Sequence, residues 1–114
     1  MNEVLNPACR PQGNSTDDLI GDTAQGYYIR GAARLTQRRW ADGIADLEIA
    51  LQKDPDLGFV CWTLGVAYRE QGHDLNESLA AFERAAAIFS SQESHQMAKS
   101  AQLEASKIRE RLAS

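Results

Sequence analysis

Cysteine, long apolar runs and signal-like features are all scarce in this sequence of 114 residues. The two cysteines, Cys9 and Cys61, are too far apart for a Cys-x-x-Cys redox pair or zinc site. No stretch approaches the ~20 apolar residues needed to cross a bilayer, and residues 1–20 lack the basic start and apolar run of a secretory signal. We therefore expect a cytoplasmic protein with reduced thiols and no membrane insertion.

An excess of positive charge is also missing. The sequence has 12 lysines and arginines against 16 aspartates and glutamates, which gives a net charge of −4 and a pI near 5.1. Nucleic acids and anionic membranes bind basic surfaces, so we expect neither as a partner. A protein or peptide is the expected partner, and its identity stays open.

The residue groupings that catalysis requires are missing as well. His73 and His95 have no second histidine or acidic cluster at ligand spacing. A glycine-rich phosphate loop, a Ser-x-x-Lys motif and a nucleophile elbow do not occur. We therefore expect no enzymatic activity, no metal and no cofactor.

The residues that are present indicate one globular, all-α domain, with 43% apolar and 25% charged residues. Helix breakers from Asp22 onward fall at helical spacings, whereas the alternation of β-branched residues typical of strands is missing. Prolines and glycines interrupt residues 1–21, which we expect to form an irregular N-terminal arm. Its apolar pairs Val4-Leu5 and Leu19-Ile20 leave open whether the arm occupies a groove of the domain.

About five helices are expected, approximately over residues 22–38, 41–53, 57–71, 75–89 and 92–112. Polar residues at N-caps and Pro or Gly after the last turn set these limits. The predicted caps are Asp22 with Gln25 as its capping-box partner, Asp74 with Glu77, and Ser90 or Ser91, and the predicted stops are Asp54-Pro55 and Gly72.

The first two helices repeat in the next two. An offset of 34 residues aligns Tyr28 with Trp62, Gly31 with Gly65, Ala33 with Ala67 and Gln37 with Gln71. An offset of 35 residues aligns Leu47 with Phe82, Glu48 with Glu83 and Ala50 with Ala85. The change of offset places one inserted residue in the turn at Gly72 to Asp74, where an insertion is tolerated.

This pattern of small and large residues resembles the tetratricopeptide repeat (TPR) family. The second unit carries it at Leu64-Gly65, Tyr68, Gly72, Ser78, Phe82 and Ala85, and the first at Tyr27, Gly31, Trp40, Gly43, Leu47, Ala50 and Pro55. The resemblance implies helix pairs over 22–57 and 58–90 and a capping helix over 91–114. It implies an α-solenoid in which small residues let paired helices cross closely.

Two residues of the first unit depart from the family pattern. Arg30 and Arg34 stand where the pattern has a leucine and a large aromatic residue. A register shifted by one residue would turn Tyr28, Ala32 and Leu35 inward and both arginines outward. The matches at Gly31 and its neighbours favour the unshifted register, and the shifted one stays open.

The resemblance implies that the first helix of each pair lines a concave surface. The residues expected on that groove are Tyr28, Ala32, Leu35, Phe59, Trp62, Val66, Arg69 and Met97. Contiguous apolar surface of this kind usually marks a contact site. For Trp62 a place in the core and a place in the groove are equally good interpretations.

Charged residues could support two binding modes, a carboxylate clamp and a basic patch. Members of the family that bind the acidic tails of chaperones use a clamp of Lys, Asn and Arg, but the matching positions here hold Tyr28, Ala32, Thr63, Ser94 and Ala98. No carboxylate clamp is therefore expected. A possible basic patch consists of Arg30, Arg34, Arg38 and Arg39, although a solvated or ion-paired helix face is the favoured interpretation.

These observations lead to one main hypothesis and two alternatives. The main one is an adaptor, scaffold or chaperone-like module that binds a helix or peptide of a partner protein in the groove. The first alternative is a self-association module that forms a homodimer through the groove or the repeat ends. The second is a non-catalytic accessory subunit of an enzyme or secretion complex.

Overall fold

The computed structural model describes residues 23–72 and 74–114. The arm expected over 1–21, the predicted cap Asp22 and His73 lie outside these residues. The described part folds into α2 (Ala24–Thr36), α3 (Trp40–Lys53), α4 (Gly58–Gln71), α5 (Leu75–Ser91) and α6 (His95–Ala113). It contains helices and turns without a strand, which confirms the all-α prediction.

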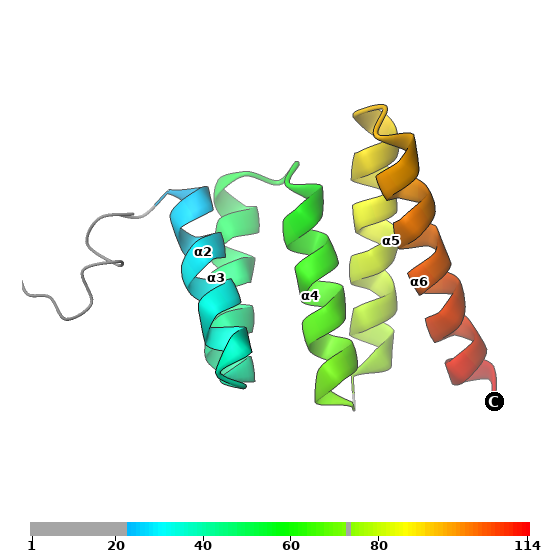
Figure 1. Cartoon of the computed structure of the whole chain (residues 1–114), viewed down its shortest axis with the longest axis horizontal. Helices are drawn as coiled ribbons and strands as arrows, with labels where there is room; N and C mark the ends of the chain where they lie inside the picture. Colours follow the sequence, from blue (N-terminus) through cyan, green and yellow to red (C-terminus); the bar gives the residue numbers. More distant parts are fainter. Residues whose placement is uncertain (1–22, 73) are drawn as a thin grey trace, which may run out of the picture.

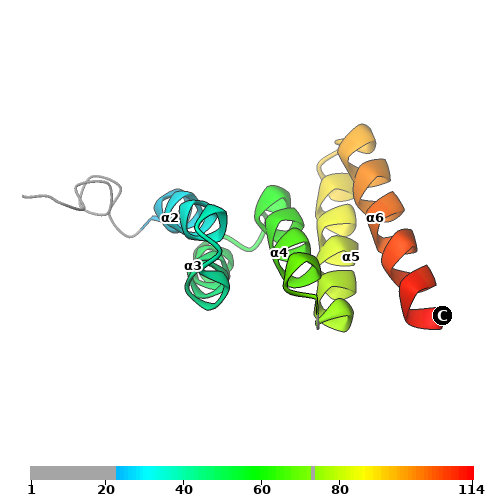
Figure 2. The same ribbon diagram turned by 60° about the horizontal axis from the view of Figure 1, so that its bottom comes forward.

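Successive helices run in alternating directions and pack side by side. The closest neighbours are α2 with α3, α4 with α5, and α5 with α6, whereas α3 and α4 touch over a smaller area (Figures 1 and 2). The order along the array is therefore the order along the chain. This arrangement has the two helix pairs and the additional last helix that the repeat predicts.

Two predicted helix ends are confirmed by backbone geometry. Asp54, immediately before Pro55, is extended at φ −146° and ψ 97°, and ends α3. Gly72 closes α4 in the left-handed conformation at φ 90°, where its N–H donates to the carbonyls of Tyr68 and Arg69. Asp74 occupies the N-cap position of α5 as expected, without a side-chain capping hydrogen bond.

Two predicted caps are replaced by other residues. The cap of α2 is Thr23, whose Oγ1 accepts a hydrogen bond of 3.0 Å from the Gly26 N–H. The prediction that Ser90 or Ser91 caps the last helix is wrong, because both belong to the final turn of α5 and Ser94 is the N-cap of α6. Ser91 Oγ donates to the Ile88 carbonyl, a bond that a serine makes equally well inside a helix.

Glycines allow the paired helices to cross closely. A Cβ added to Gly31 of α2 would lie 2.9 Å from the Gly43 carbonyl oxygen of α3. At the equivalent crossing, a Cβ on Gly65 of α4 would lie 2.8 Å from the Phe82 ring of α5. Gly31 therefore faces α3, as the unshifted register of the first helix requires.

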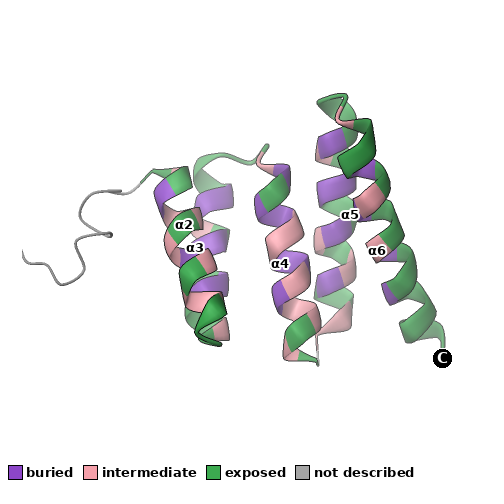
Figure 3. Cartoon of the chain, viewed as in Figure 1, coloured by how far each residue is buried: buried purple, intermediate pink, exposed green. Residues whose placement is uncertain are grey.

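The core runs through the array as a continuous cluster. Its buried residues extend from Ile44 in α3 to Ala101 in α6, and Phe82, Ala105 and Ile108 form a second cluster at the end of the array. Buried residues are concentrated on α3, α4 and α5, whereas α6 is mostly exposed (Figure 3). Most buried residues inside each helix pair therefore belong to the same cluster as those that join one pair to the next.

Candidate partner-binding surface

The alternate helices α2, α4 and α6 are linked by direct side-chain contacts. The rings of Tyr28 in α2 and Phe59 in α4 pack edge to face with their centroids 4.8 Å apart. Arg69 of α4 donates a hydrogen bond to Glu104 of α6. These three helices therefore present one connected surface, the layer in which the predicted groove lies.

Apolar side chains remain exposed on this surface. Phe59 is 37% and Met97 43% exposed, and Tyr28, Ala32 and Val66 are half-buried. Met97 lies seven residues before Glu104, two helical turns away, and so shares the face of α6 that meets α4. We call the set Tyr28, Ala32, Phe59, Val66 and Met97 the inner face.

Three other residues predicted for the groove pack between helices. Leu35 lies against α3, because a Cβ on Gly43 would come within 2.6 Å of its Cδ2. Trp62 stacks edge to face on buried Phe82, with the centroids 5.2 Å apart. Arg69 has its guanidinium 5.6 Å from the Phe82 ring centroid and pairs with Glu104.

The predicted basic patch is divided between two acidic partners. Asp46 of α3 is 3% exposed and accepts from Arg30 Nε at 3.0 Å, Arg30 NH2 at 2.9 Å and Arg34 NH1 at 2.8 Å. Arg39 pairs with exposed Asp42 in the next turn, and Arg38 is exposed with a positive φ of 61°. The four arginines therefore do not form one continuous basic row.

Asp46 is a structural residue that the sequence interpretation missed, although the internal repeat carries a signal for it. The positions of Arg30, Arg34 and Asp46 in the first unit hold Leu64, Tyr68 and Ala81 in the second. The first unit therefore has charged residues at three positions where the second unit has uncharged ones. A joint difference of this kind is consistent with contact, and the hydrogen bonds from Arg30 and Arg34 to Asp46 show that contact. Asp46 thereby accommodates both arginines of the first helix that differ from the TPR pattern.

The positions compared with a carboxylate clamp carry no free cationic donor. Thr63 Oγ1 donates to the Phe59 carbonyl at 2.8 Å, Ser94 is the N-cap of α6, and Ala98 is buried. Tyr28 and Ala32 complete the set on α2. None of these five side chains carries a positive charge that could pair with a carboxylate.

Two groups beside the α3–α4 junction have raised pKa values. Burial raises the pKa of the Cys61 thiol, partly offset by the Arg84 charge, so the thiolate is disfavoured. Burial, together with the charge and hydrogen bond of Glu48, raises the pKa of Tyr68 to about 12. Tyr68 Oη donates to Glu48 at 3.1 Å, which links α4 to α3.

The described residues contain no group of three or more His, Cys, Asp or Glu side chains that could hold a metal ion. Within the same part of the chain, no helix has the length and apolar character needed to cross a membrane.

Comparison with solved structures identifies the fold. The chain matches the crystal structure of MamA with a TM-score of 0.54 and 18% sequence identity, over 81% of this chain and 61% of that one. MamA is a TPR protein. This chain has the TPR fold. It spans 61% of the length of the MamA chain. No protein-family model matches the sequence, and neither does any curated protein.

Proposed function

We propose that this protein is a TPR interaction module that binds a helix or peptide of a partner protein on its inner face. The observation that carries the proposal is the exposure of Phe59 at 37% and Met97 at 43%, beside half-buried Tyr28, on one connected surface of α2, α4 and α6. Exposed aromatic and methionine side chains are typical anchors of recognition surfaces.

The inner face suits an apolar segment flanked by polar residues. Thr63 lies one turn after Phe59 on α4, with its hydroxyl held by the Phe59 carbonyl, and the Arg69–Glu104 pair lies at the far end. An apolar anchor on the partner would bury the Phe59 and Met97 side chains, which contributes about 25 cal/mol per Å² of apolar surface. The binding would therefore depend on these side chains more than on charge.

The test compares two substitutions to glutamate. Peptides selected from a displayed library for binding to the unmodified protein should lose about tenfold or more affinity with Phe59→Glu. They should bind the Ala45→Glu variant unchanged, since Ala45 is an exposed residue of α3. Melting curves of both variants serve as the control for folding. Equal affinity for both variants would contradict a binding site on the inner face.

A further inference from the structure

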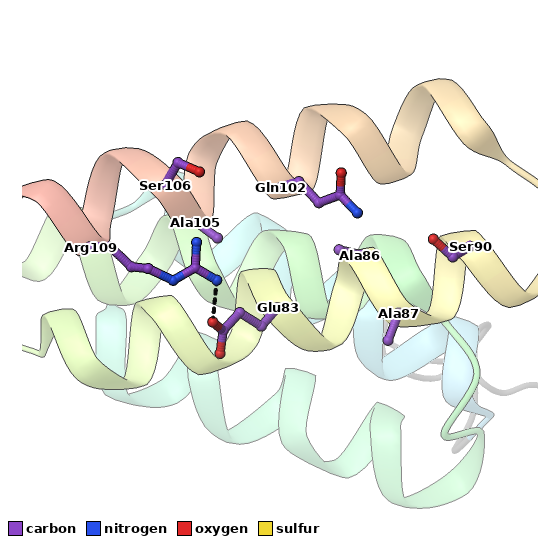
Figure 4. Close-up of a pocket in the computed structure, with 8 residues that line it drawn as sticks. All are labelled: Glu83, Ala86, Ala87, Ser90, Gln102, Ala105, Ser106 and Arg109. Carbon is purple, nitrogen blue, oxygen red and sulfur yellow. Dashed lines mark hydrogen bonds and ion pairs between the residues drawn. The ribbon is translucent and has the colours of Figure 1, made fainter.

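A second groove lies on the opposite side of the last helix, between α5 and α6. It has a volume of about 390 Å³ and is lined by Glu83, Ala86, Ala87 and Ser90 from α5 and by Gln102, Ala105, Ser106 and Arg109 from α6. Figure 4 shows the Glu83–Arg109 ion pair bridging the two helices at one end and Gln102 and Ser90 near the other. Its floor includes Ala105 and Ala86, which are 1% and 7% exposed.

The internal repeat identifies the counterpart of this groove in the first half of the array. Glu48 and Leu51 of α3 line a cavity of about 200 Å³, and the residues 35 positions later are Glu83 and Ala86. The smaller cavity, which we call the α3–α4 groove, therefore lies between α3 and α4, and its counterpart, the α5–α6 groove, lies between α5 and α6. The two are related by one step along the array.

The α3–α4 groove has a third wall, which helix α5 provides. Glu77, Ala80, Ala81 and Arg84 of α5 line it opposite the residues of α3 and α4. The same helix places Phe82 on Gly65, and Ser78 Oγ donates to the Gly65 carbonyl at 2.7 Å. Among residues 23–72 and 74–114, none provides a third wall for the groove between α5 and α6.

We propose that the α5–α6 groove is a docking site for one amphipathic helix of another protein, with a pattern of small and large residues like that of α5. An extended segment would find no partner for its backbone, because the backbone groups of α5 and α6 are used within the helices. A helix satisfies its own backbone and needs only a complementary apolar face.

The charges of the groove specify the direction of the docked helix. By the repeat relation it runs antiparallel to α6, so its first turn lies near Arg109. The first turn of α5 carries the acidic residue Glu77. Arg109 is 54% exposed and uses one amino group for Glu83, which leaves donors for an acidic residue in the first turn of the docked helix.

The chain itself supplies the probe for a binding experiment. A synthetic peptide with the sequence of α5, Leu75–Ser91, acetylated and amidated, is titrated into the full chain and followed by calorimetry. The proposal expects saturable binding. Ala87→Arg and Ser106→Arg, both at exposed positions of the groove, should each raise the Kd about tenfold or more.

Two variants outside the groove are the matched controls. Ala45→Arg changes an exposed alanine of α3, and Phe59→Glu changes the inner face. Both should leave the Kd of the peptide unchanged. Ala45→Arg and the two groove variants should keep the melting temperature of the unmodified chain, whereas Phe59→Glu gives up its ring contact with Tyr28 and should melt at a lower temperature while staying folded at the temperature of the titration. If the groove is the docking site, only the two groove variants should weaken binding of the peptide.

Three results would overturn the proposal. The first is the absence of saturable binding at about 1 mM peptide. The second is binding that Phe59→Glu abolishes and the groove variants do not, which would place the peptide on the inner face. The third is a dimer of the chain that Ala87→Arg converts to monomer in sedimentation, which would make a second copy the occupant.

Discussion

Asp46 shows how one residue can compensate two unusual neighbours. Its carboxylate is almost fully buried, whereas the side chains of Arg30 and Arg34 are 31% and 26% exposed. A buried carboxylate requires hydrogen bonds to replace its hydration, and the bidentate Arg30 together with Arg34 provides three. The trio therefore pairs α2 with α3 by charge, where the second unit uses Leu64, Tyr68 and Ala81.

We expect Asp46→Ala to lower the free energy of unfolding by about 3 kcal/mol, because it leaves two arginines without their shared partner. This value is at the lower end of the range for breaking a buried ion pair, because the side chains of both arginines are partly exposed to water. The triple variant Arg30→Leu, Arg34→Tyr, Asp46→Ala copies the second unit and should recover most of the loss. Urea unfolding measures both, and a triple variant no more stable than the single one would contradict the repeat equivalence.

Tyr68 gives the domain a dependence of stability on alkaline pH. Its pKa is raised to about 12 by burial first and by Glu48 second, from an ordinary value of 10.0. Because the folded pKa lies above the unfolded one, this stabilisation is complete below the unfolded pKa and is lost as the pH rises through the folded pKa.

We therefore expect the phenol of Tyr68 to ionise near pH 12 in an ultraviolet titration, taken as the difference between the unmodified chain and Tyr68→Phe. Glu48→Gln should lower this pKa, because it removes the negative charge that opposes ionisation. A midpoint unaffected by Glu48→Gln would mean that the hydrogen bond between α3 and α4 is absent in solution.

At the scale of elements, α4 requires glycine at two positions, one inside the helix and one at its C-cap, for different reasons. Gly65 has no room for a Cβ against Phe82, whereas Gly72 has open space around it but a φ of 90°. The first constraint is steric and belongs to a pair of residues. The second is conformational and belongs to the backbone alone.

Gly65→Ala should therefore cost about 1–3 kcal/mol of stability through overpacking, and Gly72→Ala about 1 kcal/mol through the left-handed conformation. Combining each with Phe82→Leu in a double-mutant cycle separates the two causes. We expect a favourable coupling for Gly65→Ala and none for Gly72→Ala, measured by denaturant unfolding. Equal coupling for both glycines would show that Gly65 is not at a tight crossing.

The helices were predictable because their signals are local. Pro55 and Gly72 act within one turn of chain, and the repeat offset placed Gly31 and Gly65 at equivalent crossings. Ser90 and Ser91 misled the prediction, since serine suits an N-cap and the end of a helix equally well.

The candidate site was less predictable because exposure depends on neighbouring helices. Trp62 and Phe59 lie on the same helix three residues apart, yet Trp62 packs on Phe82 while Phe59 stays 37% exposed. In the sequence alone, Asp46 resembles an ordinary solvated carboxylate, and only the packing of α2 against α3 shows that it is buried. The groove between α5 and α6 could not be predicted for the same reason, because its lining depends on how the two helices pack.

At the scale of the whole molecule, the junction between the first helix pair and the remainder is narrow. Tyr28 and Phe59 span it on the inner face, and the hydrogen bond from Tyr68 to Glu48 spans it on the other. Beneath these contacts the core continues from Leu51 of α3 to Val60 of α4. A shared core favours unfolding of the array as one unit.

The two tryptophans allow this cooperativity to be tested, because Trp40 begins α3 in the first pair and Trp62 lies in α4 of the second. Both side chains are half-buried against the core, so the fluorescence of each changes when the helix that carries it unfolds. Trp40 therefore reports the first helix pair and Trp62 the second. In the single-tryptophan variants Trp62→Phe and Trp40→Phe, the urea midpoint from fluorescence should equal that from circular dichroism of the same variant. Comparing the two probes within each variant removes the stability cost of the substitution itself. A fluorescence midpoint for Trp40 below the circular dichroism midpoint would show that the first pair unfolds separately, and the narrow junction would then be a boundary between independent units.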